Sequence, residues 1–203
     1  MKQHRFIIPT ILLLVIFLLA GCGPSKQVTR IDTKEVTDLS GKWNDTDSRL
    51  VAEEMVDDLL KRNWLTDFMT AKGKKPVVIV GKIRNKSNEH IEIETFTKDI
   101  ERELINSGKI TFVASKEERE QVREERKDQQ DFASPETFKE FYKEIGADYL
   151  MSGVLNSIED RADGEKVIYY QIDLELIDIE TNTKAWIGTK KIKKYIGQNG
   201  YSL

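Results

Sequence analysis

The first strong pattern of apolar positions in the body of the chain has the period of a helix. Between residues 51 and 60 the apolar side chains recur three and four residues apart: Val51, Ala52, Met55, Val56, Leu59 and Leu60. Residues at that spacing share one face of an α-helix, which predicts an amphipathic helix with a wide apolar stripe. The polar run NDTDS at 44–48 supplies candidate N-caps for its start. Apolar residues at 64–69 extend this surface, and packing against a core explains them better than an exposed docking face.

From residue 74 to residue 158, short apolar runs alternate with amphipathic stretches. The apolar runs predict strands, at 74–83, 110–115 and 148–158. The periodic stretches predict helices, over 95–108, over 116–130 and from Ser134-Pro135 to Gly146. Val122 is the only aliphatic residue of the second helix, so we expect that helix to be largely exposed. The third has an apolar side made of Phe138, Phe141, Tyr142 and Ile145.

The C-terminal part of the chain has the period of a half-buried strand. After Tyr170, apolar residues alternate with polar ones up to Leu176. The turn residues Thr181-Asn182-Thr183 follow, which predicts an antiparallel hairpin between strands 167–179 and 185–194. We expect Trp186, beside the turn, to pack against a helix or the sheet. Together these elements predict an α/β domain that ends in an antiparallel hairpin.

The first residues have the order of a bacterial export signal. Lys2 and Arg5 precede an apolar run at 6–19. A membrane span needs about 20 apolar residues, so this run is short for a retained transmembrane anchor, which is the alternative to cleavage. The polar stretch 23–40 has no sustained period, and we interpret it as a tether.

Leu19-Ala20-Gly21-Cys22 resembles the bacterial lipobox, in which the cysteine takes a diacylglycerol and the peptide bond before it is cut. The resemblance implies a signal peptide at 1–21 and a lipid on Cys22, the only cysteine of the chain. Two or more acyl chains hold a protein stably to a membrane. The expected organisation is a lipidated cysteine with a flexible tether at 22–40, then one α/β domain at 41–203 whose first part, 41–72, is a helical extension.

Composition and charge exclude several classes of function. The 203 residues have a formal net charge of −3, whereas nucleic-acid-binding domains usually have a basic face. Once the signal is removed, His90 is the only histidine and the one cysteine is acylated. Catalysis by a Cys-His or Ser-His-Asp set would have to use His90, and a zinc site has no ligand set. A surface or loop-fixing role suits His90 better.

Carboxylates are abundant, but their spacing argues against a catalytic or metal site. Glu92 and Glu94 alternate along an extended segment as solvent-facing residues do, and the same holds for Asp173 and Glu175. The segment EDRADGE at 159–165 fits a hairpin turn better than a calcium loop. The glycines are isolated, without a phosphate-binding loop. We therefore expect no catalytic residue, no cofactor, no metal and no small-molecule substrate.

Several segments together resemble the LpoB family, the lipoprotein activators of penicillin-binding proteins. The resemblance covers most of the chain after the signal and rests on the lipobox and on these segments: DLSGKWNDTDSRLVAEEMVDDLL, VVIVGKIRNKSNEHI, NSGKITFVAS, GADYLMSGVL and YQIDLELIDIETNTKAWIGTKKIKK. GADYLMSGVL also resembles the TolB N-terminal domain and the curli secretion channel lipoprotein. It is the order of the segments that is specific.

The resemblance implies a small mixed β-sheet flanked by helices, similar to the TolB N-terminal domain, and no enzyme activity. It implies an outer-membrane lipoprotein that faces the periplasm and binds a bifunctional penicillin-binding protein. The best-known members carry a long proline-rich linker, whereas 23–40 is short and holds only Pro24. This departure bears on which partner the protein binds, and it does not bear on the fold to the same extent. The alternatives are an assembly or secretion lipoprotein related to the curli channel and a hydrolase without a recognisable site.

Two groups of residues are candidates for contact with the partner. The loop Arg84–Ile91 follows the first strand at its C-terminal end, where open α/β sheets present their sites. Its candidates are Asn85, Asn88 and His90; the alternative is that the asparagines only shape the turn. The second group lies on the charged helix and consists of Arg119, Arg123 and Arg126, because arginine is enriched at contact hot spots.

Overall fold

The computed structural model describes residues 27–134, 136–137, 139–140 and 143–197. Cys22 and the other residues of the expected signal and lipobox lie outside these residues. The chain divides into two compact units, residues 1–35 and residues 36–203. In the first unit, residues 27–35 hold a turn in which the Glu35 amide donates to the Asp32 carbonyl at 3.1 Å. The helices and strands named below belong to the second unit.

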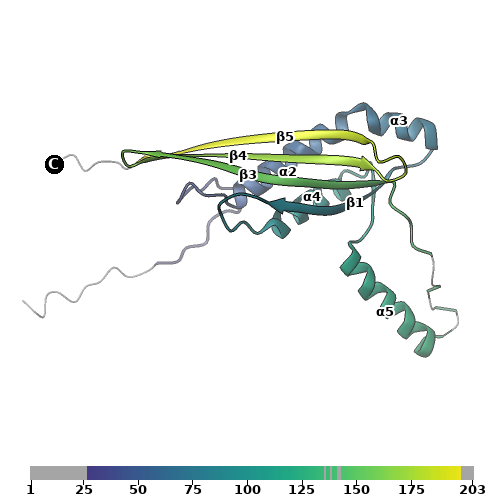
Figure 1. Ribbon diagram of the computed structural model, residues 1–203. Helices are drawn as coiled ribbons and strands as arrows, with labels where there is room; N and C mark the ends of the chain where they lie inside the picture. Colours follow the sequence, from purple (N-terminus) through teal and green to yellow (C-terminus); the bar gives the residue numbers. More distant parts are fainter. Residues whose placement is uncertain (1–26, 135, 138, 141–142, 198–203) are drawn as a thin grey trace, which may run out of the picture. The chain divides into compact units, whose positions relative to one another are not determined.

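The second unit is built on a five-stranded mixed sheet with the order β2-β1-β3-β4-β5 (Figure 1). The central strands are β1 (Val77–Asn85), β3 (Tyr149–Ala162) and β4 (Glu165–Asp178), and the edges are β2 (Thr111–Phe112) and β5 (Lys184–Ile196). β1 runs parallel to β2 and to β3, whereas β3, β4 and β5 are antiparallel. The predicted class, α/β with a small mixed sheet, is confirmed.

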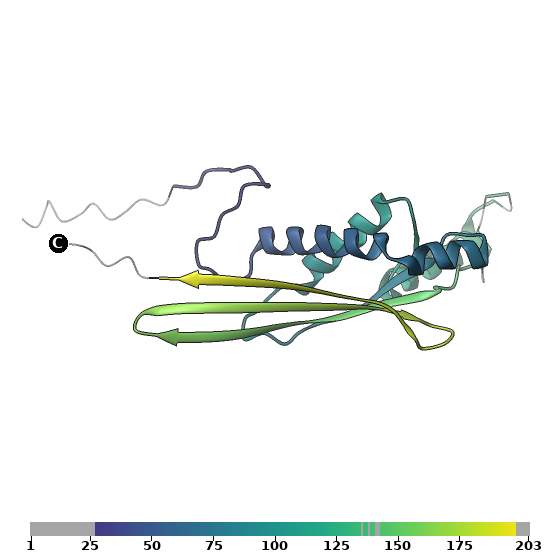
Figure 2. The ribbon, with the colours of Figure 1, turned by 90° about the horizontal axis from the view of Figure 1, so that it is seen from above.

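Four helices accompany this sheet: α2 (Asp45–Lys61), α3 (Asn63–Lys72), α4 (Ile93–Asn106) and α5 (Lys116–Phe132). α2 and α4 pack against each other and lie along one face of the sheet (Figure 2). α2 begins at Asn44 with a capping box, in which the Asn44 and Asp47 side chains each accept the other's backbone N–H. α5 has no buried residue, as its charged sequence predicts.

The core lies between the helices and one face of the sheet. The alternation after residue 166 buries every second side chain of β4 to an exposed fraction of at most 1%: Ile168, Tyr170, Ile172, Leu174 and Leu176. The apolar stripe of α2 and the face of α4 made of Phe96, Ile100 and Leu104 pack against it. The intervening residues of β4 are only partly buried. The described helices therefore leave the opposite face of the sheet uncovered.

The predicted hairpins are confirmed. β4 and β5 pair from Lys166↔Ile196 to Ile177↔Lys184 across the turn at Thr181-Asn182-Thr183. The segment 159–165 also turns a hairpin, since Ala162 pairs with Glu165. Asp163 and Gly164 there have φ of 49° and 82°, as a two-residue turn of type I′ requires.

The helix predicted from Ser134 to Gly146 is wrong over the described residues, which form no helix between Phe132 and Asp148. Pro135, Phe138, Phe141 and Tyr142 lie outside them. Ile145, on the expected apolar side, is 60% exposed. A short helix depends on burial of its apolar face, and Ile145 supplies none here. The strand predicted at 110–115 is also shorter, with only Thr111 and Phe112 paired.

Candidate interaction site

The predicted loop after β1 is held by Asn85. The Asn85 Oδ1 atom accepts from the Ser87 backbone N at 2.9 Å and from the Ser87 Oγ at 2.7 Å, while its Nδ2 donates to the Glu89 carbonyl at 2.8 Å. Both ends of the amide are therefore used inside the loop. This geometry favours the alternative in which Asn85 shapes the turn.

Asn88 and His90, the other two loop candidates, are exposed. The backbone N of Asn88 donates to the Ser157 Oγ at 3.2 Å, which ties the loop to β3. The side chains of Asn88 and His90 make no hydrogen bond within the described part of the chain. They are available at the surface, whereas Asn85 is not.

The arginines of α5 are already partly engaged. Arg123 makes two hydrogen bonds of 2.8 Å to the Glu144 carboxylate, and Arg126 makes one of 3.4 Å. The bond from Arg123 lowers the pKa of Glu144 below its ordinary value, with both arginines adding to the effect. Arg119 has a buried Nε without a partner among the described residues. Over the same residues, no hydrogen bond or ion pair joins these arginines to the loop after β1.

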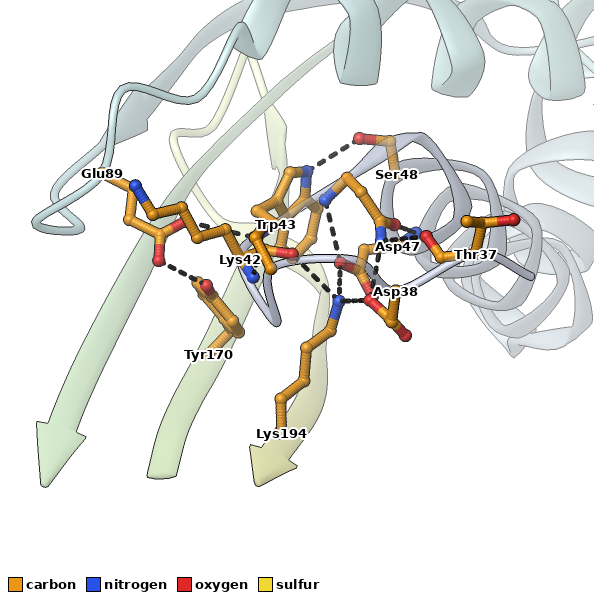
Figure 3. Close-up of polar contacts among 11 residues, drawn as sticks. Thr37, Asp38, Lys42, Trp43, Asp47, Ser48, Glu89, Tyr170 and Lys194 are labelled. Carbon is orange, nitrogen blue, oxygen red and sulfur yellow. Dashed lines mark hydrogen bonds and ion pairs between the residues drawn. The ribbon is translucent and has the colours of Figure 1, made fainter. Parts of the chain in front are cut away.

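The structure reveals a polar cluster that the sequence patterns did not single out, centred on Lys194 of β5 (Figure 3). The Lys194 Nζ lies 2.6 Å from an Asp38 oxygen, 2.5 Å from an Asp47 oxygen and 3.1 Å from the Lys42 carbonyl. Asn44 adds hydrogen bonds to the Thr37 carbonyl and to Asp38. The chain before α2 is thereby fastened to the end of β5.

Burial and the neighbouring carboxylates shift the pKa of Lys194 in opposite directions. The Lys194 side chain is only 10% exposed and that of Asp47 9%. Burial is the largest single influence and lowers the pKa of Lys194, but the bonds to Asp38 and Asp47 together outweigh it and raise that pKa above its ordinary value. The ammonium is therefore charged at neutral pH and holds two carboxylates.

Glu89, in the loop after β1, extends the cluster to β4. One oxygen of Glu89 accepts from the Trp43 backbone N at 3.1 Å, and the other accepts from the Tyr170 hydroxyl at 2.7 Å. Tyr170 is fully buried, and this burial, with the bond to Glu89, raises the pKa of its hydroxyl. Trp43 packs edge-on against Tyr170, with ring centroids 5.5 Å apart.

We call this cluster the clasp, meaning Asp38, Trp43, Asn44, Asp47, Glu89, Tyr170 and Lys194. Its polar groups are paired with one another. It is suited to holding segment 37–48 in place. One sequence signal does point to it: Lys194 stands between Ile192 and Ile196 at inward-facing positions of β5, where a cation requires a partner.

Neither a metal centre nor a membrane-crossing helix is found in the described residues. In that part of the chain no three His, Cys, Asp or Glu side chains are grouped so as to bind a metal ion. The same residues contain no helix whose length and apolar character would let it cross a membrane.

Comparison with known proteins identifies a family. The family model described as peptidoglycan-synthase activator LpoB matches residues 47–192. The LpoB C-terminal domain from Salmonella enterica is similar at 18% identity over 72% of this chain and 98% of that chain, with a TM-score of 0.40. The corresponding Escherichia coli domain has 17% identity, the same coverage and a TM-score of 0.38. Lipoprotein GNA1162 from Neisseria meningitidis has 12% identity over 59% of this chain and 83% of its own, with a TM-score of 0.36. A search of curated proteins found no match.

The family match extends from the first turn of α2 into β5 and takes in all of the sheet except the last residues of that strand. It includes Asp47, Glu89 and Tyr170 of the clasp but ends two residues before Lys194. The segments that suggested the family from the sequence lie largely inside it. Because the match spans most of the 203 residues, the chain belongs to the LpoB family of peptidoglycan-synthase activators.

Proposed function

We propose that this protein is an outer-membrane lipoprotein that activates a bifunctional penicillin-binding protein by binding to it, without catalysis of its own. The observation that carries the proposal is the family match over residues 47–192, which lies within the second unit, residues 36–203. The paired state of the polar groups in the clasp agrees with a binding role. The Cys22 lipid would hold the protein on the periplasmic face of the outer membrane.

Activation through binding has a definite thermodynamic requirement. The domain must bind the active state of the synthase more tightly than the inactive state, because equal affinity for both shifts nothing. About 1.4 kcal/mol of differential affinity changes the ratio of the two states tenfold. A modest surface contact is sufficient for that difference.

The tether limits where the partner is met. Thr37 is already bonded to Asn44, so the free connection from Cys22 runs only to residue 36. Its 14 residues span roughly 50 Å when fully extended, and a flexible chain spans less on average. We propose the organisation 22–40 for the lipidated cysteine and tether, of which residues 37–40 are held against the domain, and 41–203 for the domain, with a synthase that reaches close to the outer membrane.

Reconstitution tests this function. The chain without residues 1–21 and with Cys22→Ser is added to purified bifunctional synthases of the same cell and lipid-linked precursor, and glycan-strand synthesis is measured with and without it. We expect binding and a faster rate. Absence of binding together with an unchanged rate for every bifunctional synthase would refute the activator role, and wall cleavage by the chain alone would assign an enzyme.

A further inference from the structure

One long edge of the sheet is left open beside β1. β2 pairs with β1 only at Val77↔Thr111 and Val78↔Phe112. From Ile79 to Asn85, no strand of the described chain pairs with the side of β1 that faces away from β3. Unpaired backbone N–H and C=O groups along a sheet edge are a template for another strand.

A bulge sets which groups this edge presents. The register with β3 shifts between Val80 and Ile83. Before the bulge, the Val78 carbonyl accepts from the Val113 N–H, so the backbone groups of Val78 face the β2 side, which is the open edge further along. After the bulge, the Lys86 N–H donates to the Leu155 carbonyl, so the backbone groups of Lys86 face β3. Successive residues of a strand direct their backbone groups to opposite sides, and Val80, Ile83 and Asn85 therefore direct theirs to the open edge.

The same strand carries a row of unpaired cations. Lys82 and Arg84 are exposed at alternate positions on the uncovered face, and Lys86 continues the spacing just beyond β1. None of the three forms an ion pair with another described residue, although many other Lys and Arg residues of the second unit do. Three like charges in a row attract an acidic strand and repel a basic one.

A groove lies along this edge on the helix side. It has a volume of about 800 Å³ and is lined by β1, by α4 and by the first turns of α5. Val80 and Ile83 of the strand and Ile93 of α4 supply its apolar part, and charged side chains of α4 and α5 line the rest, among them Glu94, Glu101, Glu117 and Glu118. An added strand would therefore meet cations on one face and, next to β1 on the other face, the apolar part of this groove.

The opposite edge of the sheet is different. Along β5, the inward side chains are bonded to the protein's own chain: Trp186 to Asp58, Lys190 to Glu54, and Lys194 to Asp38 and Asp47. Lys191 and Lys193 are exposed on the outer face, with the same spacing as Lys82 and Arg84. β5 thus resembles β1 in surface charge but has segment 38–47 and α2 in place of an apolar groove.

We propose that the β1 edge, Ile79–Lys86, is the docking site for the synthase, which adds an extended segment to the sheet. That segment has acidic residues at alternate positions, opposite Lys82, Arg84 and Lys86, and apolar residues between them, facing Val80, Ile83 and Ile93. Main-chain hydrogen bonds then give affinity, and the alternate side chains give specificity. The inference rests on the proposed function and names the surface that carries it.

Charge reversal on the two edges is the first test. Binding of a bifunctional synthase is measured for the Cys22→Ser chain and for two variants of it, Lys82→Glu/Arg84→Glu and the matched control Lys191→Glu/Lys193→Glu. We expect the β1 variant to bind at least about tenfold more weakly, mainly through slower association at low salt, and the β5 variant to bind as the parent does. Melting temperatures equal to the parent's show that both variants are folded.

A backbone readout tests the added strand itself. Amide hydrogen exchange is followed for the peptide covering 79–86 with and without the synthase, and protection is expected there and not along β5. In addition, Lys82→Cys in the Cys22→Ser chain places the only thiol of the protein on this edge. A cross-linker at that thiol should attach to an acidic extended segment of the synthase, and the same linker at Lys191→Cys should not.

The outcomes separate the two proposals. If the parent chain binds no bifunctional synthase, the proposed function is refuted and the docking site with it. If the parent binds but the β1 and β5 variants bind equally, the docking site is refuted and the function stands. Unchanged binding accompanied by aggregation of the β1 variant would mean that Lys82 and Arg84 only guard the edge against self-association.

Discussion

Lys194→Met is the change that most directly tests the clasp. Methionine keeps the length and apolar stem of lysine but removes the ammonium. The substitution therefore deletes the contacts to Asp38, Asp47 and the Lys42 carbonyl with little change in packing. Asp47, whose side chain is 9% exposed, is left without its cation.

The expected cost follows from the burial of the two carboxylates. Removing one partner of a buried ion pair costs about 3–5 kcal/mol, because the remaining charge stays buried and uncompensated. Asp38 is 45% exposed and therefore screened by solvent, and Asp47 keeps its bond from the Asn44 N–H at 3.0 Å. Both facts favour the low end, about 3 kcal/mol. At about 2–4 °C per kcal/mol for a domain of this size, the melting temperature should fall by roughly 6–12 °C.

Thermal unfolding of the Cys22→Ser chain, followed by circular dichroism, measures this loss. Lys193→Met is the matched control, since Lys193 is adjacent, exposed and on the outer face of β5, and surface changes of this kind stay within about 0.5 kcal/mol. Adding Asp38→Asn to Lys194→Met should recover part of the loss, because it removes one uncompensated charge. A Lys194→Met melting temperature equal to that of Lys193→Met would refute the reasoning.

Three further predictions concern other parts of the chain. Trp186→Ala should destabilise the domain by about 3–5 kcal/mol in urea unfolding, since the indole is 6% exposed and bonded to Asp58; an unchanged midpoint would contradict its burial. Cys22→Ser in the full precursor should leave the signal uncleaved and the protein unacylated by mass spectrometry, and an unmodified thiol in the parent would contradict the anchor. Because the pKa of Lys194 is raised in the folded state, its stabilisation should be constant from neutral pH to about pH 10.5 and be lost at higher pH. On the alkaline side, the melting-temperature difference between the parent and Lys194→Met should therefore shrink only above that pH.

The period of the sequence predicted the parts of the fold in which one face is buried. The alternation from Tyr170 to Leu176 is regular because each inward residue of β4 is buried in the core that the helices and the sheet share, so both strands and their turn could be predicted. β3 runs on to Ala162, beyond the predicted end at Ile158. Its last residues are polar, and no described helix covers them. Alternation of apolar and polar residues marks a strand only where one face is buried, so it could not predict this exposed end of β3.

The clasp could be predicted only in part, because its contacts join residues far apart in the sequence. Lys194 and Asp47 are 147 positions apart, and Tyr170 and Glu89 are 81 apart. Local patterns indicated the loop after β1 and several candidate caps at 44–48. They named Asn85 as a contact candidate, with turn shaping as the alternative, and passed over Glu89. Polar loop residues look alike in a sequence, and only the fold shows which of them faces a buried tyrosine.

Lys194 of the clasp and the proposed docking edge lie on different strands of the sheet, although Glu89 of the clasp belongs to the loop that follows β1. Segment 37–48 is fastened to the end of β5 by Lys194, whereas the open edge is on β1, and β3 and β4 lie between those strands. Three strand spacings separate β5 from β1 by roughly 14 Å across the sheet. A pull on the proposed tether would be taken up by the ion pairs to Lys194 and by the capped start of α2, and it would reach the loop after β1 through the Trp43 N–H that donates to Glu89. The proposed lipid anchor and the proposed docking edge use different residues, so neither contact has to be released for the other to form.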